Sequence, residues 1–90
     1  MTYATEHAAA VEQIERSVNR VFELAAELAA NVKPRTNLAK AMTAMSLFVG
    51  LPKGAAYADD FNVVAWCLNE GVLDADVIEL GLVAAGFIRN

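Results

Sequence analysis

The chain has 90 residues, of which 57% are hydrophobic and 20% are charged, and its formal net charge at pH 7 is −4. This combination of high apolar content and low charge excludes an intrinsically disordered chain. The length suits one small domain, so we expect a single helical domain over residues 1–90. With so few polar residues some apolar surface stays uncovered, and self-association is the simplest way to cover it.

The cellular compartment is indicated by the cysteine count and by the apolar segments. Cys67 is the single cysteine, which excludes an intrachain disulfide and fits a reducing compartment. The start of the chain lacks the basic residues and apolar run of a signal peptide. The longest nearly apolar stretch, residues 41–51, is shorter than the roughly 20 residues that a membrane span needs. We therefore expect a soluble cytoplasmic protein without membrane contact.

The first predicted element is a long helix over residues 5–31, which stops before Pro34 because proline disfavours helical geometry in the residue preceding it. Its apolar residues alternate spacings of three and four, which is the a and d pattern of a heptad repeat. The pattern consists of Val11, Ile14, Val18, Val21, Ala25, Leu28 and Val32, and His7 extends it backward. The seam predicts helix pairing, and Val11, Ile14, Val18 and Val21 are its candidate interface residues. Whether the seam is internal core or a dimer interface stays open.

The second predicted helix covers residues 37–49, with Asn37 as its N-cap and Gly50 as its end. Its apolar face includes Met42, Met45 and Phe48, which we regard as a candidate adaptable contact patch because methionine fits irregular surfaces. The same spacing is also typical of internal core. The following GLPKGAAYA stretch, residues 50–58, contains two glycines and a proline, and we expect a mobile loop there.

Two shorter helices are predicted in the last third of the chain, over residues 59–70 and 74–85. The first of them begins at Asp59 or Asp60, whose carboxylates suit a helix N-terminus. Asp74 is the expected N-cap of the other helix. Gly71 and Gly86 are the expected stop signals, each followed by an apolar residue that can fold back in a Schellman contact. The predicted fold is therefore all-α, a small helical bundle of about four helices with one long N-terminal helix.

Catalytic, cofactor and metal sites are not expected. A nucleophile needs a base within hydrogen-bond reach, and His7 is the single histidine of the chain. Cys67 stands beside Trp66 in an apolar segment, where a small core residue is the expected role. The paired aspartates are explained as helix caps, and the ligand spacing of calcium or zinc sites is missing. We therefore predict a protein that is not an enzyme.

Residues 69–87 have the outline of a helix-turn-helix, in which the second helix normally reads DNA. Here that helix carries Asp74, Asp76 and Glu79 and no basic residue, so phosphates would repel it. A packed helical hairpin is the main interpretation. The alternative is an acidic inhibitor that imitates phosphates and occupies the groove of a nucleic-acid-binding protein.

Charge is unevenly distributed along the chain: residues 1–30 carry −3, residues 31–53 carry +4 and residues 54–90 carry −5. The basic band consists of Lys33, Arg35, Lys40 and Lys53. An ordinary solvated surface is the simplest interpretation of such a band. The alternative is weak, salt-sensitive binding of nucleic acid by a regulator with a degenerate helix-turn-helix.

The function predicted from these patterns is a small protein–protein interaction module, acting as an adaptor, assembly factor or inhibitor of another protein. Its expected partners are a second copy of itself in a homodimer, a larger protein, or both. Nucleic acid is not an expected partner.

Overall fold

The computed structural model describes the backbone of residues 3–90 and the side chains of residues 7–90. Over this range the fold is all-α, as predicted, with one long and three shorter α-helices and one 3₁₀ segment. In chain order the elements are α1 (Tyr3–Ala29), α2 (Leu38–Val49), η1 (Pro52–Tyr57), α3 (Ala58–Asn69) and α4 (Ala75–Ala84). No helix in the described part of the chain is both long and apolar enough to cross a membrane.

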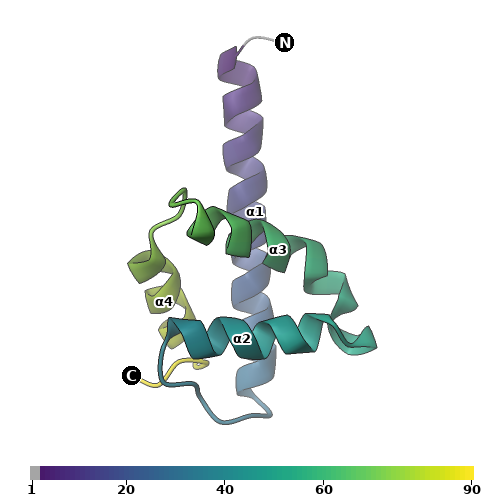
Figure 1. Ribbon diagram of the computed structural model, residues 1–90, viewed down its shortest axis with the longest axis vertical. Coiled ribbons are helices and arrows are strands. Elements are labelled where there is room, and N and C mark those ends of the chain that lie inside the picture. Colours follow the sequence, from purple (N-terminus) through teal and green to yellow (C-terminus); the bar gives the residue numbers. More distant parts are fainter. Residues whose placement is uncertain (1–2) are drawn as a thin grey trace.

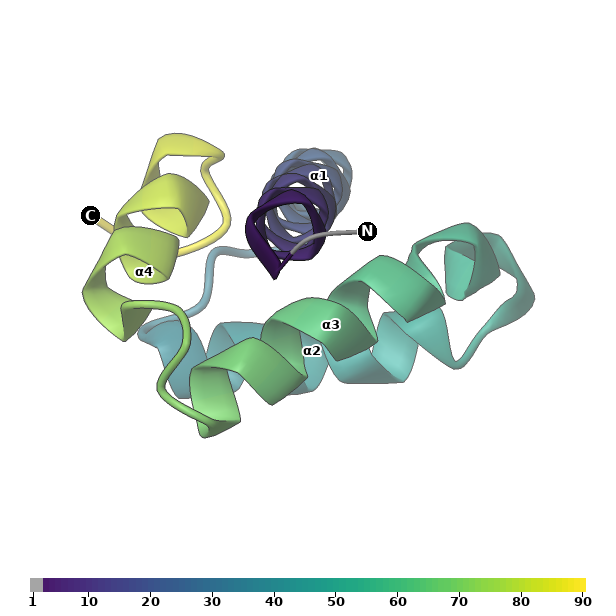
Figure 2. The same ribbon diagram turned by 90° about the horizontal axis from the view of Figure 1, so that it is seen from above.

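Helix α1 is longer than the rest of the molecule is wide. Its 27 residues span about 40 Å at the α-helical rise of ~1.5 Å per residue. The other helices gather around its C-terminal half, and its N-terminal half extends beyond them (Figure 1). Seen along α1, helix α4 lies on one side and α3, with α2 behind it, on another (Figure 2). We call α2, η1, α3 and α4 the body, and residues 3–16 of α1 the overhang.

The hydrophobic core lies between the C-terminal half of α1 and the body. Every element except the overhang contributes to it, and the C-terminal residues close it. The buried apolar side chains are Val21, Leu24, Ala25, Ala41, Met45, Tyr57, Phe61, Val64, Cys67, Ile78, Leu82, Phe87 and Ile88. Burial of the core therefore fixes residues 17–29 of α1 and leaves the overhang outside.

The helix ends follow the predicted capping residues closely. The Asn37 side chain accepts a hydrogen bond from the backbone N–H of Lys40 at 3.0 Å, and Asp74 accepts one from Asp76 at 2.9 Å. Gly71 and Gly86 adopt positive φ angles of 73° and 85°. The residue after each glycine donates its N–H back across the last helical turn, as in a Schellman motif. Phe87 is fully buried by this reversal, which confirms its predicted fold-back.

Two local predictions are wrong. Residues 52–57 form a 3₁₀ helix with Gly54 and Tyr57 buried, instead of part of an irregular loop. Gly54 is needed there because a Cβ atom would overlap the backbone carbonyl of Phe48. Helix α3 starts one residue before Asp59, with Tyr57 as its N-cap and no side-chain cap hydrogen bond. The aspartates Asp59 and Asp60 lie in its first turn instead of capping it.

The C-terminal residues anchor the connection between α1 and α2. The N–H of Arg35 donates to the carbonyl of Phe87 at 2.8 Å, and the N–H of Arg89 donates to the carbonyl of Arg35 at 2.7 Å. These bonds form a short parallel bridge between Arg35 and Ile88. The bridge holds the α1–α2 connection beside the end of α4, which closes the body at the end opposite the overhang.

The contact between α1 and α4 depends on one glycine. Gly81 lies in the middle of α4, where a Cβ atom would overlap the ring of Phe22 from α1. The missing side chain therefore lets the Phe22 ring sit directly against the α4 backbone. Glycine destabilises a helix interior by about 1 kcal/mol relative to alanine. In α4 this loss of helix stability goes together with the close packing of the Phe22 ring.

Candidate protein-interaction surface

The heptad seam of α1 is divided between core and surface. Val21 is 1% exposed and belongs to the core, and Val18 is half-buried against it. Ile14 is half-buried, and Val11 is 40% exposed on the overhang. Of these four candidate interface residues, Val21 is therefore unavailable on the surface of this chain, and Val11 is the most accessible.

A groove lies where the overhang leaves the body. Its walls are Val11, Ile14 and Glu15 on α1 and Val72 and Leu73 in the α3–α4 connection, and its volume is about 240 Å³. Val72 is 54% exposed, so the groove presents apolar side chains from two separate segments. The Schellman turn at Gly71 places Val72 in this position, because the positive φ reverses the chain after α3.

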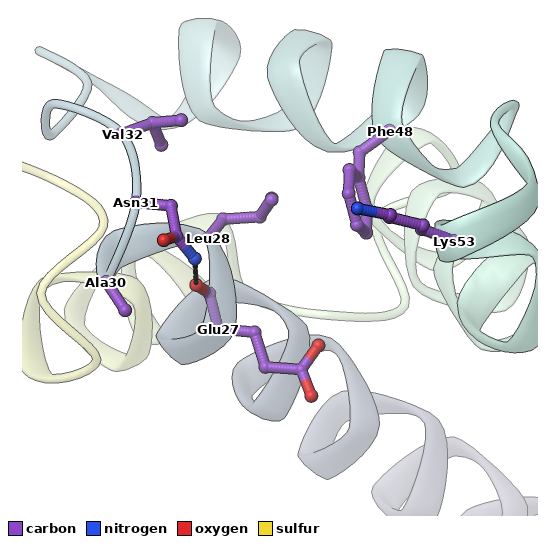
Figure 3. A pocket seen from close by; sticks show the side chains of 7 residues that line it. All are labelled: Glu27, Leu28, Ala30, Asn31, Val32, Phe48 and Lys53. Atoms are coloured by element: carbon purple, nitrogen blue, oxygen red, sulfur yellow. Dashed lines mark hydrogen bonds between the residues drawn. The ribbon is translucent and has the colours of Figure 1, made fainter.

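A second hollow lies at the other end of the same seam, with a volume of about 610 Å³. Leu28 and Val32, the last two seam residues, line it together with Phe48 from α2 (Figure 3). Glu27 and Lys53 add one acidic and one basic side chain to its lining. The apolar seam of α1 is thus covered in its middle and accessible at both ends.

The predicted methionine patch belongs largely to the core. Met45 is fully buried, whereas Met42 and Phe48 are half-buried and pack against the core. Met45 is therefore not available for contact with a partner, and the internal-core interpretation applies to it. Phe48 keeps one accessible edge, in the larger hollow.

Two of the three candidate acidic residues have structural contacts. Glu79 of α4 accepts a hydrogen bond from the backbone N–H of Leu38 at 3.1 Å, which satisfies a free donor at the start of α2. Asp74 caps α4, and Asp76 is exposed in the first turn of the same helix. These contacts tie the acidic residues to the helix starts that they stabilise, so a structural role accounts for Asp74 and Glu79.

The four residues of the basic band do not form one cluster. Lys33 and Arg35 lie in the α1–α2 connection, and Lys40 lies in the first turn of α2. Lys53 lies beyond the other end of α2 in η1. The intervening helix has 12 residues, which corresponds to roughly 18 Å of helix between the two ends.

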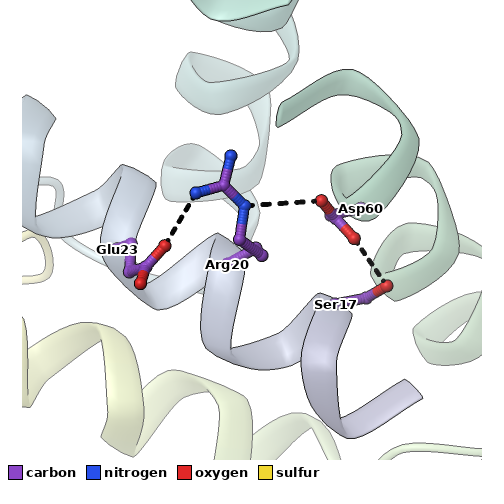
Figure 4. A network of polar contacts seen from close by, with 4 residues as sticks. All are labelled: Ser17, Arg20, Glu23 and Asp60. Atoms are coloured by element: carbon purple, nitrogen blue, oxygen red, sulfur yellow. Dashed lines mark hydrogen bonds and ion pairs between the residues drawn. The ribbon is translucent and has the colours of Figure 1, made fainter. Parts of the chain in front are cut away.

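A polar network joins α1 to α3 beside the core (Figure 4). The hydroxyl of Ser17 donates to Asp60 at 2.9 Å, and Nε of Arg20 lies 3.7 Å from the same carboxylate. Arg20 also pairs with Glu23 at 2.9 Å, and its guanidinium stacks 4.2 Å from the ring centroid of Tyr57. This network places the first turn of α3 against α1, and the sequence indicated it only through the paired aspartates.

Electrostatics in this network follow from burial and from the neighbouring charges. The hydrogen bond to Glu23 raises the pKa of Arg20, so its guanidinium stays charged. Burial raises the pKa of Tyr57, and the Glu27 carboxylate raises it further. Both raised pKa values keep the proton on its group, so a charged Arg20 guanidinium lies over a neutral Tyr57 ring.

The two side chains considered for chemistry lie in different parts of the molecule. Cys67 is buried in the core, and His7 is exposed on the overhang. Among residues 7–90, no three histidine, cysteine, aspartate or glutamate side chains gather in a metal-binding arrangement.

Further apolar side chains are exposed that the sequence did not single out. Trp66 on α3 is 60% exposed, and Val77 and Leu80 on α4 are 58% and 69% exposed. Both short helices are apolar on nearly all sides, so helical periodicity could not indicate which side chains face the core. Val77 and Leu80 lie three residues apart on α4 and therefore share one face of that helix.

Comparison of the chain with models of protein families, with characterised proteins and with solved structures gives no match.

Proposed function

We propose that the chain is a small, non-enzymatic protein–protein interaction module that associates with itself through the overhang of α1. One observation carries the proposal: the heptad stripe that forms core at Val21 continues to Val11 on the overhang, where Val11 is 40% exposed. An exposed apolar stripe on a helix is the usual basis of helix pairing. We also propose that the protein is located in the cytoplasm.

Self-association is the partner that this surface favours. A twofold dimer uses the same patch on both copies, so a single stripe suffices as both halves of the interface. The groove formed with Val72 and Leu73 enlarges the patch at its base. The hidden positions Val21 and Met45 stay within the chain and take no part in this surface.

The test is the oligomeric state of a variant with one charge on the stripe. Val11→Asp places a carboxylate in the pairing face, and we expect the wild type to form dimers and this variant to be monomeric in light scattering. Leu80→Asp is the matched control, because Leu80 is an exposed apolar residue of α4 away from the stripe. The control should dimerise like the wild type. A monomeric wild type, or a dimer that Val11→Asp leaves intact, contradicts the proposal.

A tagged pull-down from native lysate, with and without nuclease and read by mass spectrometry, identifies any further binding partners. A second protein that survives nuclease treatment indicates an adaptor or inhibitor in addition to the dimer. Loss of all retained material with nuclease contradicts a protein-binding module and favours the basic residues Lys33, Arg35 and Lys40 as a nucleic-acid contact.

A further inference from the structure

The end of the body opposite the overhang brings together basic side chains from two distant parts of the sequence. The α1–α2 connection and the C-terminal segment lie together there (Figure 1). The N–H of Arg89 donates to the carbonyl of Arg35 at 2.7 Å, so these two residues are direct neighbours. Lys33 lies two residues before Arg35, and Lys40 lies in the first turn of α2. We call Lys33, Arg35, Lys40 and Arg89 the basic end, which differs from the basic band of the sequence by Arg89 in place of Lys53.

The four cations of the basic end are accessible and are not neutralised by an acid. Lys33, Lys40 and Arg89 are exposed, and Arg35 is half-buried. No carboxylate among residues 7–90 lies within ion-pair distance of any of these four side chains. The Arg35 guanidinium donates to the carbonyl of Lys33 at 3.4 Å, which is a neutral acceptor. The basic end therefore keeps its positive charges available to an anion from outside the chain.

The acidic side chains at the overhang end are too distant to cancel these charges. Glu15 lines the groove at the overhang, and Asp74 and Asp76 lie at the start of α4, directly after the groove residue Leu73. Glu15 is roughly 24 Å along α1 from the start of the α1–α2 connection, whereas the Debye length is about 10 Å at 0.1 M salt. A ligand at the basic end is therefore largely screened from these carboxylates, although the net charge of the chain is −4.

The side chains around the four cations favour phosphate over a protein partner. Within residues 33–40 and 88–90 the other exposed side chains are small or polar, namely Pro34, Thr36, Asn37, Ala39 and Asn90. Protein interfaces centre on apolar and aromatic side chains, whereas phosphates are contacted by arginine, lysine and small polar residues. Single-stranded nucleic acid is bound by stacking its bases on aromatic rings, and the ring of Phe87 at this end is fully buried.

We infer that the basic end binds the phosphate backbone of double-stranded nucleic acid without reading its sequence. Each strand of a duplex carries one phosphate per ~3.4 Å of axis, which suits cations spread over a connection and one helical turn. Readout of base edges requires an element that enters a groove. Here the backbone bridge between Arg35 and Ile88 holds the connection against the end of α4. This contact lies away from the overhang and so goes beyond the proposed self-association.

Fluorescence anisotropy of labelled DNA and RNA duplexes of about 20 base pairs tests the inference, and the two duplexes show which source of phosphate binds. Four phosphate contacts give a slope of about −3.6 for the logarithm of the association constant against the logarithm of salt concentration on B-DNA. Duplexes of unrelated sequence should bind equally, because the contact is to phosphates alone.

Arg89→Gln and Lys53→Gln form the matched pair of variants, since both side chains are exposed and both changes remove one positive charge. Arg89→Gln removes one phosphate contact, so the salt slope should become less negative by about 0.9 and the dissociation constant should rise roughly eightfold at 0.1 M salt. Lys53→Gln lies outside the basic end and should leave both quantities unchanged. Circular dichroism verifies that both variants keep their helical content.

Glu79→Gln tests the same surface with the opposite expected effect. The Glu79 carboxylate accepts the N–H of Leu38 at the start of α2, so it lies near the basic end. Glutamine keeps an oxygen that can accept this hydrogen bond and removes the negative charge. We expect the dissociation constant of the duplex to fall about twofold, whereas a damaged fold would raise it.

The outcomes decide between phosphate, an acidic protein and general charge attraction. Salt-dependent binding of either duplex that Arg89→Gln weakens and Lys53→Gln leaves unchanged supports the inference. No binding of either duplex at about 0.05 M salt overturns it, and so does equal weakening by the two variants. Retention of poly-glutamate without retention of a duplex also overturns it, in favour of an acidic protein partner.

Discussion

The two halves of α1 carry the same heptad pattern and have opposite surroundings. In residues 17–29 the stripe belongs to the core, with Val21 and Ala25 at or below 1% exposure. In residues 7–16 the stripe is accessible, with Val11 at 40% exposure. The difference teaches that a heptad pattern predicts a covered helix face without specifying what covers it.

Helix length explains where the change occurs. The short helices have 12, 12 and 10 residues, or about 15–18 Å each. Since they cross α1 instead of lining up along it, they gather around its C-terminal half (Figure 1). The apolar stripe continues past the covered part, and the proposed self-association rests on that continuation.

The largest expected difference between the two halves comes from one substitution made in each. Val21→Ala removes two buried methyl groups from the core, and we expect the free energy of unfolding to fall by about 2–3 kcal/mol. Val11→Ala should change it by less than about 0.5 kcal/mol in the monomer. Urea denaturation at low protein concentration measures both. Equal losses for the two variants would show that the overhang is packed as tightly as the core.

A second substitution tests the packing that distinguishes the covered half. Gly81→Ala places a Cβ atom against the ring of Phe22, and overpacking costs about 1–3 kcal/mol. The gain in helix propensity of about 1 kcal/mol offsets part of this, so we expect a net loss of about 1–2 kcal/mol. Thermal denaturation measures the loss.

The matched control for Gly81→Ala is the double variant with Phe22→Ala. Removing the ring should turn the alanine at position 81 from destabilising to neutral or stabilising, which a double-mutant cycle detects as coupling. If Gly81→Ala is equally unfavourable with and without the Phe22 ring, the close contact between α1 and α4 is not its cause.

A smaller effect is expected where the covered half begins. Ser17→Ala removes the hydroxyl that donates to Asp60, and we expect a loss of about 1 kcal/mol in unfolding free energy. Ser46→Ala is the matched control, because the Ser46 hydroxyl is exposed and bonds within its own helix. If the two variants lose the same free energy of unfolding in urea, the polar network does not help to fix α3 on α1.

The smallest effect is a pH dependence in the covered half. Because the folded state raises the pKa of Tyr57, it holds the phenolic proton more tightly than the unfolded chain does. Its contribution to stability is therefore complete below about pH 10, the ordinary tyrosine value, and is lost as the pH rises through the higher folded value. Tyr57→Phe should flatten the fall of unfolding free energy above that pH. An unchanged profile would mean that Tyr57 does not cause it.

Much of the fold could be predicted because local signals and burial agree. Asn37, Asp74, Gly71 and Gly86 act at the helix ends through contacts within one or two turns, which a sequence pattern records directly. Residues 52–57 were not predictable as a 3₁₀ helix, because their conformation depends on Gly54 touching the backbone at Phe48, outside the segment.

The candidate site was only partly predictable for the same physical reason. The stripe through Val11 and Ile14 is visible in the sequence, but its exposure depends on where α3 and α4 pack. The role of Glu79 depends on the start of α2, 41 residues away in sequence. The sequence alone therefore suggested that the Glu79 carboxylate is a free surface charge. Long-range contacts such as these leave no local pattern.

Hydrogen–deuterium exchange along α1, measured at low and high protein concentration, tests the central claim most directly. The account predicts that amides of residues 17–29 are protected at both concentrations, whereas amides of residues 7–16 become protected only as the concentration rises. Protection of residues 7–16 that does not change with concentration would contradict it, because the overhang would then be either covered within the chain or never paired.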